Sequence, residues 1–381
     1  MVLSLRLTGA KVLHETMLQD TALSIEAGQI VEMSGGREVD LSDFLIFPGI
    51  VDTHGDAFEK HLAPRRGAMK DVDQGLIAAE AEIASNGITT AVLAQFYSWE
   101  GGMRGPEFAE KVFAARAEIA DRVGTDLRAQ LRFEIGLLDH YAAMQDFIQR
   151  HAIQYVALND HLPHDEIASG KRPQRLAGQA LRVGKNPDRH WEDLQAMHAA
   201  MPRVPAALDR LCAALSDKGV SLGSHDDTTP EDRATWRRRG VTISEFPETL
   251  AAAEAAHSAG EPVILGAPNV VRGGSHKGNI SAIELISMGL CDALASDYHY
   301  PSLKRAAFLI ADAGICSLAQ AWELISSRPA AILGLNDRGS LVPGARADLV
   351  ILDARNRDVV AAIASGEITY MKGVIAQRLI N

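Results

Sequence analysis

The sequence predicts an α/β fold centred on a closed (β/α)8 barrel. Short apolar segments alternate with helical patterns through the middle of the chain, which is typical of a parallel sheet whose strands are joined by helices. Eight such segments fall within roughly 250 residues, the usual length of an eight-stranded α/β barrel. The chain has 381 residues, 47% of them apolar, so it can hold that barrel and one small domain.

The barrel strands are expected where apolar, β-branched runs end at turn residues. A doubly wound open sheet is the alternative, but the sequence lacks Gly-x-Gly-x-x-Gly and a Walker A loop, which disfavours a nucleotide-binding sheet. The predicted strands are 45–53, 88–94, 127–134, 153–159, 219–224, 241–245, 262–267 and 292–296, and the clearest helical patterns are 107–122, 191–217, 248–259 and 302–313.

Both ends of the chain show short strand patterns separated by turns, such as Ala27-Gly28 and Pro343-Gly344. We therefore expect residues 1–47 and 337–381 to form one small composite β domain, a β-sandwich built from both termini. Residues 48–336 would form the barrel.

The formal net charge of −11 disfavours nonspecific binding to nucleic acid or to anionic membranes. The three cysteines, Cys212, Cys291 and Cys316, form no Cys-x-x-Cys pair, so a reducing compartment fits best. No apolar run approaches the ~20 residues of a membrane span, and no signal peptide is expected. These features predict a cytoplasmic protein with no nucleic-acid or membrane partner.

The first barrel strand is expected to end in His54-Gly55-Asp56. Side chains two residues apart on a strand point the same way, so this imidazole and this carboxylate can bind one metal ion. On its own the pair is more typical of a strand end with two solvated polar groups.

Four further residues of metal-ligand type end other predicted strands: Glu134, His161, His225 and Asp297. Each also has an ordinary structural explanation. Glu134 can pair with Arg132. The residues after His225, which are Asp226, Asp227 and Thr228, can cap the N-terminus of a helix that begins near Pro230. The carboxyl ends of barrel strands meet on one face, however, and catalytic residues of barrels lie there.

The six residues therefore predict a centre for two divalent metal ions, most readily zinc, with manganese, iron or nickel as alternatives. His54 and Asp56 would bind the first ion, His161 and His225 the second, and Glu134 would bridge the two. Asp297 would bind the first ion and act as general base and then acid. Two such ions lower the pKa of a shared water, so the expected reaction is hydrolysis without a covalent enzyme intermediate.

The motif Pro48-Gly49-Ile50-Val51-Asp52-Thr53-His54 and the late segment Pro343 to Leu349 resemble the amidohydrolase superfamily. This resemblance implies a TIM-like metallo-dependent hydrolase barrel. The chain departs from the superfamily by having Asp56 in place of a histidine and Glu134 where many members use a carboxylated lysine. Its predicted ligands also end strands one, three, four, five and eight, whereas the superfamily usually uses one, four, five, six and eight.

Longer motifs resemble the ribose 1-methylphosphonate 5-triphosphate diphosphatases of the carbon–phosphorus lyase pathway, which release pyrophosphate. These motifs run over His54–His61, Asn159–His161, Ser224–Pro230, Glu245–Pro247, Gly266–His276 and Ser296–Tyr298. The resemblance implies a phosphorylated small-molecule substrate. By analogy with such barrels alone, we expect a homodimer.

An anionic substrate needs local cations, and several lie near these motifs. The predicted phosphate-binding residues are Lys60, His61, Lys185, Arg272, Ser275 and His276. Lys185 belongs to the basic segment 168–190, which is expected to be either a lid over an anionic ligand or a solvated loop.

Two other functions remain open at this point. The same centre suits an amidohydrolase or deaminase that acts on a carbon–nitrogen bond, although the cations disfavour it. A non-catalytic barrel scaffold is also conceivable, but the complete ligand set disfavours that.

Overall fold

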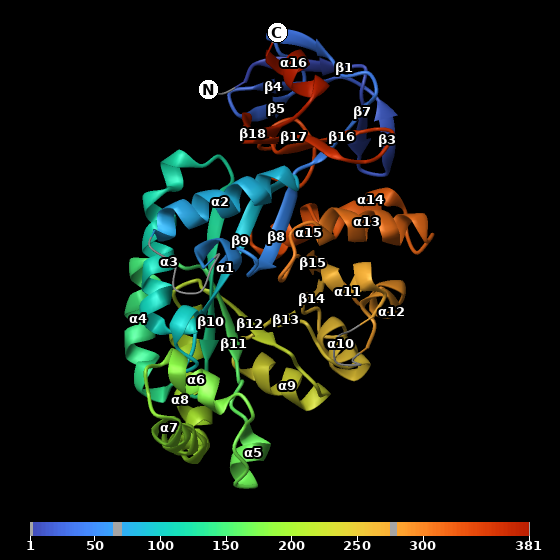
Figure 1. Ribbon diagram of the computed structural model, residues 1–381. Coiled ribbons are helices and arrows are strands. Elements are labelled where there is room, and N and C mark those ends of the chain that lie inside the picture. Colours follow the sequence, from blue (N-terminus) through green and yellow to red (C-terminus); the bar gives the residue numbers. More distant parts are fainter. Residues whose placement is uncertain (1–2, 64–70, 275–279, 381) are drawn as a thin grey trace. The chain divides into compact units, whose positions relative to one another are not determined.

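A computed structural model describes residues 3–63, 71–274 and 280–380 (Figure 1). The chain divides into two compact units, and each is described by itself. The first unit comprises residues 1–93, 118–128 and 262–381, and the second comprises residues 94–117 and 129–261. None of the described helices is long and apolar enough to cross a membrane.

The central sheet has eight strands whose order in the sheet is their order in the sequence. Its described neighbours pair in parallel, and an isolated parallel bridge between Gly55 and Asp297 joins the first strand to the segment after the last. The predicted (β/α)8 barrel is therefore confirmed, as a nearly closed barrel. Its strands are β8 (Ile50–Gly55), β9 (Ile88–Tyr97), β10 (Asp126–Glu134), β11 (Tyr155–Asn159), β12 (Ser221–His225), β13 (Ile243–Glu245), β14 (Val263–Gly266) and β15 (Ala293–Ala295).

The expected first strand, 45–53, is wrong in its extent. It splits into β7 (Phe44–Pro48), which joins another sheet, and β8 of the barrel. The chain changes sheets at Gly49, whose N–H donates to the carbonyl of Asp348 at 2.8 Å. The strand count is otherwise as predicted, so Glu134 does end the third barrel strand.

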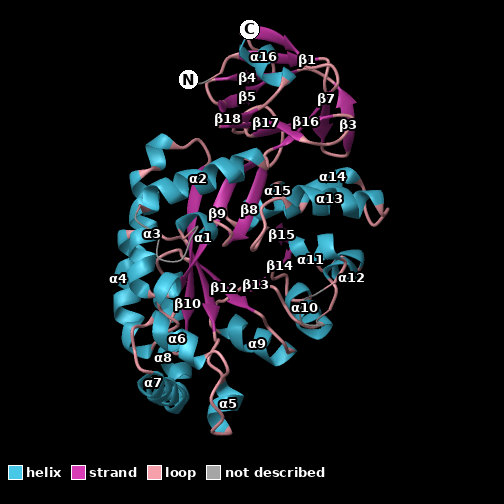
Figure 2. Cartoon of the chain, viewed as in Figure 1, coloured by secondary structure: helices cyan, strands magenta, loops and turns pink. Residues whose placement is uncertain are grey.

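In the first unit, helices alternate with the barrel strands, as Figure 2 shows for β8, α2 and β9. Polar caps fix where several begin: Asp71 accepts from the N–H of Gln74 at the start of α2, and Ser317 forms a capping box with Gln320 at the start of α14. The helices are α1 (Glu59–Leu62), α2 (Val72–Ser85), η2 (Ala120–Arg122), α11 (Ala267–Arg272), α12 (Ala282–Ser287), α13 (Ser302–Asp312), α14 (Leu318–Glu323), α15 (Ser327–Ile332) and α16 (Val374–Ile380).

In the second unit, the helix expected over 191–217 is interrupted. A 3-10 turn, η4, separates two helices, and Pro202 and Pro205 lie in the first turns of η4 and α8, where a missing N–H is tolerated. The helices of this unit are η1 (Gly102–Arg104), α3 (Pro106–Glu118, whose last residue belongs to the first unit), η3 (Leu138–His140), α4 (Tyr141–Arg150), α5 (His164–Ala168), α6 (Leu176–Arg182), α7 (Pro187–Ala200), η4 (Met201–Arg203), α8 (Val204–Ser216), α9 (Pro230–Arg238) and α10 (Leu250–His257).

The basic segment 168–190 is largely helical and is no irregular loop, because it contains α6 and the start of α7. Leu176 of this segment joins one buried cluster, whose other members are Trp99, Leu162, Ile167, Trp191 and Leu194. Three cations of the segment form ion pairs: Arg172 with Asp188 and Lys185 with Asp193, each at 2.6 Å, and Arg189 with Glu192 at 3.1 Å. Its role as a lid stays a prediction.

Two further sheets lie in the first unit. A four-stranded sheet has the order β5 (Gln29–Val31), β4 (Leu23–Glu26), β1 (Leu5–Thr8), β6 (Arg37–Asp40). A six-stranded sheet has the order β18 (Glu367–Met371), β17 (Val359–Ala364), β16 (Leu349–Asp353), β7, β2 (Lys11–His14), β3 (Met17–Asp20).

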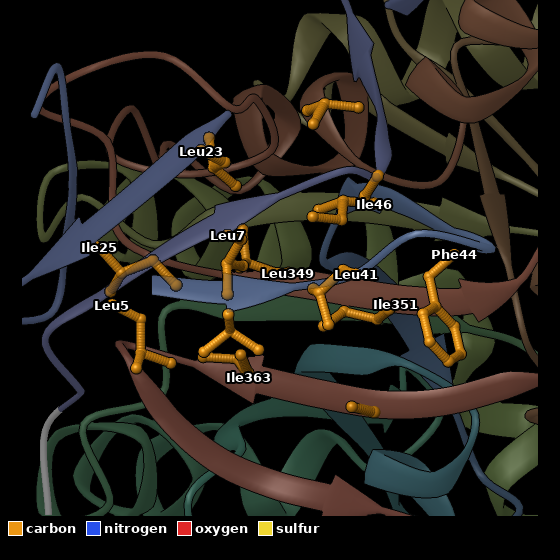
Figure 3. Packing of buried hydrophobic residues seen from close by; sticks show 14 of the residues in the cluster. Leu5, Leu7, Leu23, Ile25, Leu41, Phe44, Ile46, Leu349, Ile351 and Ile363 are labelled. Atoms are coloured by element: carbon orange, nitrogen blue, oxygen red, sulfur yellow. The ribbon is translucent and has the colours of Figure 1, made fainter. Parts of the chain in front are cut away.

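Both ends of the chain contribute to one apolar core (Figure 3). Strand β7 pairs antiparallel with β16, with Ile46 opposite Ile351. Leu7, Ile25 and Ile363 are fully buried in the same cluster. The domain boundaries 1–47, 337–381 and 48–336 stay a prediction.

Asp126, at the start of β10, lies in a cluster of arginines of the first unit. Its Oδ2 accepts from Arg128 Nε at 3.1 Å and from Arg338 Nη1 at 2.7 Å. Burial raises the pKa of the carboxyl, but the guanidinium groups outweigh this effect and hold the pKa below 3.8. A lowered pKa means that Asp126 stabilises the fold above its unfolded pKa of about 4, and that this contribution is lost as the pH falls.

We predict that Asp126→Asn lowers the free energy of unfolding by about 1–2 kcal/mol at pH 7, because charge-assisted hydrogen bonds are lost. The difference from wild type should shrink as the pH falls below about 4, because the unfolded wild-type chain then gains the Asp126 proton before the folded protein does. Urea unfolding at pH 7 and pH 3.5 measures this. Asp358→Asn, which removes an exposed pair with Lys372 at 3.5 Å, is the control and should change little. An Asp126→Asn effect independent of pH would contradict the assignment.

Candidate metal centre

In the first unit, backbone hydrogen bonds bring together three predicted ligands. The N–H of Asp297 donates to the carbonyl of His54 at 2.9 Å, and the N–H of Asp56 donates to the carbonyl of Asp297 at 3.0 Å. His54 is fully buried at the end of β8, and Asp297 follows β15. These residues therefore stand on neighbouring strand ends, as the sequence predicted for the carboxyl face of a barrel.

A buried carboxylate ties the same two strands together. Asp52 accepts from the N–H of Ser296 at 2.9 Å and from its Oγ at 2.5 Å, and more weakly from the N–H of His54 at 3.4 Å. Burial raises the pKa of Asp52, and these hydrogen bonds oppose the rise without cancelling it. Asp52 thus links the residue before Asp297 to the strand that carries His54.

Gly55 is required here because of close approach. A Cβ at this position would lie 2.8 Å from Asp52 Oδ2, 2.9 Å from Ser296 Oγ and 2.9 Å from Tyr300 Cε1. All three neighbours are buried, and two of them are bonded to each other. Any larger side chain must therefore push apart the contact between β8 and β15.

In the second unit, Glu134 and His161 form a bonded pair. Glu134 is buried at the end of β10, its Oε1 is hydrogen-bonded to His161 Nδ1, and its Oε2 accepts from the N–H of His161 at 3.0 Å. Burial lowers the pKa of His161, but the hydrogen bond and charge of Glu134 outweigh burial and raise it above 6.5. Glu134 is therefore bonded to His161 through both of its oxygens, and its role as a bridging carboxylate stays a prediction.

His225, at the end of β12, adds a second imidazole to this unit. Its Nδ1 lies 3.0 Å from Asp226 Oδ2, and its Nε2 accepts from Arg132 Nη2 at 3.1 Å. His161, His225 and Asp226 each offer one ligand atom, and these atoms lie within 4.8 Å of one another. Imidazole nitrogens and a carboxylate oxygen at this spacing fit a zinc-like divalent ion.

Asp226 and Asp227 have other roles than the helix capping considered from the sequence. Thr229 is the N-cap of α9 and forms a capping box with Asp232. Asp227 Oδ2 instead accepts from Ser224 Oγ at 2.6 Å and from Ser244 Oγ and Arg233 Nη1 at 3.0 Å.

Arg233 is fully buried and also donates to Glu261 Oε2 through Nη2 at 2.7 Å. A buried guanidinium between two carboxylates satisfies charges that would otherwise be costly to desolvate. Because Ser224 precedes His225, this network fixes the end of β12.

The sequence did not single out Glu245, which is a further buried acid at a barrel strand end. It ends β13, is fully buried, and accepts from Gln130 Nε2 at 2.7 Å and from Tyr155 OH at 2.6 Å. The available signal was its place directly before Phe246-Pro247, at a strand end like the other acids.

Left-handed backbone conformations follow three of the barrel strands. Asp226, Phe246 and Asp297 follow β12, β13 and β15, and their φ angles are 60°, 53° and 54°. Residues other than glycine rarely adopt such angles, and each costs on the order of 1–3 kcal/mol. Such strain is typical of functional sites, where the surrounding bonds hold it in place.

The predicted phosphate-binding residues have carboxylate or phenol partners where the structure describes them. Lys60 Nζ and His61 Nε2 both contact Glu82, each at 2.6 Å, and Lys185 contacts Asp193. Arg272 Nη1 donates to Tyr298 OH at 3.3 Å. Ser275 and His276 lie outside the described residues. The phosphate-binding role of all six stays a prediction.

Known proteins share both the sequence and the fold of this chain. The profile of the Amidohydrolase family matches residues 194–377. Alpha-D-ribose 1-methylphosphonate 5-triphosphate diphosphatase of Escherichia coli K12 is 31% identical over 367 residues, which cover 93% of this chain and 96% of the relative. The chain belongs to the amidohydrolase family.

Solved structures support the fold of this amidohydrolase. A Xaa-Pro dipeptidase with bound methionine superposes with a TM-score of 0.65 at 13% identity, covering 97% of this chain and all of the dipeptidase. An N-acyl-D-glutamate deacylase from Bordetella bronchiseptica, complexed with zinc and a phosphonate inhibitor, gives 0.62 at 14% identity, covering 97% and 96% of the two chains. At these identities the likeness concerns the fold alone.

We predict that Gly55→Ala destabilises the protein by about 1–3 kcal/mol, the usual effect of overpacking a buried contact. Gly178→Ala is the matched control, because Gly178 lies within α6 with nothing within 4 Å of its added Cβ. There alanine should be neutral or stabilise by up to about 1 kcal/mol, since it favours helix. Urea unfolding measures both variants. Equal stability of wild type and Gly55→Ala would contradict the close packing of β8 and β15.

Proposed function

We propose that this amidohydrolase is a metal-dependent hydrolase that releases pyrophosphate from α-D-ribose 1-methylphosphonate 5-triphosphate in phosphonate catabolism. The observation that carries the proposal is the 31% identity to the diphosphatase of that name over nearly the whole of both chains. The predicted ligands support it, because each described cluster of them offers nitrogen and oxygen donors at strand ends.

Six residues would hold two divalent ions: His54, Asp56 and Asp297 on the first unit, and Glu134, His161 and His225 on the second. When bound, such ions lower the pKa of a water and polarise a phosphoryl oxygen. The chain's own residues orient the side chains around these ions and carry protons. Glu134 bonds both the Nδ1 and the backbone N–H of His161, which fixes the ring beside this carboxylate.

Asp297 is the proposed proton carrier. Its carboxylate would take a proton from the attacking water and pass it to the departing pyrophosphate. The left-handed backbone at Asp297 and its bonds to the end of β8 hold this residue in one place before substrate arrives. Such preorganisation favours reaction because no reorientation is needed during the proton transfer.

The test of the substrate is direct. We predict that the purified protein, supplied with α-D-ribose 1-methylphosphonate 5-triphosphate and zinc or manganese, releases one pyrophosphate per substrate, measured by a coupled pyrophosphate assay. Ammonia released from a panel of purines and pyrimidines, with no pyrophosphate, would instead establish a carbon–nitrogen hydrolase. No bound metal after growth in metal-supplemented medium would favour a non-catalytic scaffold.

We predict that Asp297→Asn retains most of its metal but loses at least about 100-fold in turnover, the scale of general acid–base assistance. Asparagine keeps an oxygen ligand and cannot accept the proton. Asp292→Asn is the control, because Asp292 lies before β15, at the opposite end of this strand from Asp297, and is not a proposed ligand. Its carboxylate accepts from the N–H of Val263 at 2.9 Å, a bond that asparagine can also accept. Metal content by atomic emission and turnover by pyrophosphate release are measured together. Near-normal turnover of Asp297→Asn would remove Asp297 from this role.

A further inference from the structure

Arg132 places a guanidinium group directly on a predicted metal ligand. It lies on β10 two residues before Glu134, so the two side chains point to the same side of the strand. Its Nη2 is 3.1 Å from His225 Nε2, and the side chain is buried. The sequence suggested Arg132 only as a partner of Glu134.

A second contact holds Arg132 in this position. The Cζ atom of Arg132 lies 3.9 Å from the centroid of the Phe96 ring, a cation–π distance. Arg104 contacts the same ring at 4.3 Å, but its Nη1 binds Glu100 Oε2 at 2.6 Å. Phe96 therefore orients one arginine toward His225 while the other is held by a carboxylate of its own loop.

This arrangement limits what else His225 can bind. A neutral imidazole has one acceptor nitrogen, and a guanidinium group always donates and is always charged. Because Arg132 donates to Nε2, the lone pair of that nitrogen is in use, and Nδ1 faces Asp226 at 3.0 Å. A divalent cation on either ring nitrogen of His225 must break this hydrogen bond, because an imidazole protonated at Nε2 cannot accept from Arg132, and the cation then lies close to a buried positive charge.

We infer that Arg132 sets the metal affinity of the His161–His225 half of the centre, so that this half binds its ion more weakly than a site without the arginine. The inference rests on the proposed function only in taking His225 as a ligand. It makes the two predicted ions unequal: one held firmly, and one that exchanges because an internal cation competes for its ligand.

The test is a zinc titration of the metal-free protein against a chromophoric chelator, without substrate. Wild type should show two classes of zinc site that differ in affinity by at least about tenfold, and Arg132→Gln should strengthen the weaker class by at least about tenfold. Arg104→Gln, on the same ring but not on His225, should leave both classes unchanged. Two equal classes in the wild type, or an unchanged or weaker second class in Arg132→Gln, would overturn the inference.

A second variant covers the case in which Arg132→Gln does not fold, as judged by circular dichroism. Phe96→Leu removes the ring that orients the guanidinium group and leaves its charge, so the weaker class should gain affinity by a smaller factor. An unchanged weaker class in Phe96→Leu would count against the inference. Because the titration measures zinc alone, a failure to release pyrophosphate would sink the proposed function and leave this result untouched.

Discussion

The contact between β8 and β15 is the constraint on which the rest of this amidohydrolase depends. A barrel has no free edge only if its first and last strands pair. Here β15 is short, and the pairing relies on one bridge at Gly55, the backbone bonds of Asp297 with His54 and Asp56, and the buried carboxylate of Asp52. The same few atoms close the sheet and hold His54 and Asp297, so the fold and the proposed metal ligands depend on one set of bonds here.

In the second unit, a network of buried charged side chains fixes the end of a barrel strand, β12. Asp227, Arg233 and Glu261 are buried and satisfy one another, and the network reaches Ser224 beside His225. Replacing such a network by apolar side chains often preserves stability, so its value lies more in fixing one geometry than in adding free energy. By fixing the end of β12, this network helps to hold the His225 imidazole beside Arg132 and Asp226.

Much of this could be predicted from the sequence, because strand patterns and strand-end residues are local. The number of barrel strands, the approximate places of all but the first, and the positions of His54, Glu134, His161, His225 and Asp297 at strand ends follow from apolar runs of strand length. The features that the sequence did not predict depend on contacts between residues that are far apart in the chain. The split at Gly49 depends on a carbonyl of Asp348, the pairing of Lys60 and His61 with Glu82 depends on how α1 meets α2, and the contact of Arg132 with His225 depends on packing against Phe96. No spacing rule in the sequence encodes such contacts.

The pairing of β7 with β16 has a consequence for how the protein is made. Ile46 leaves the ribosome early, but its partner Ile351 emerges only after the whole barrel has been synthesised. Until then β7 has a strand neighbour on one side only, β2, and its other edge exposes unpaired backbone groups that favour aggregation. Contacts so distant along the chain also form slowly. Nascent chains of this amidohydrolase should therefore depend on chaperones until their last segment is released.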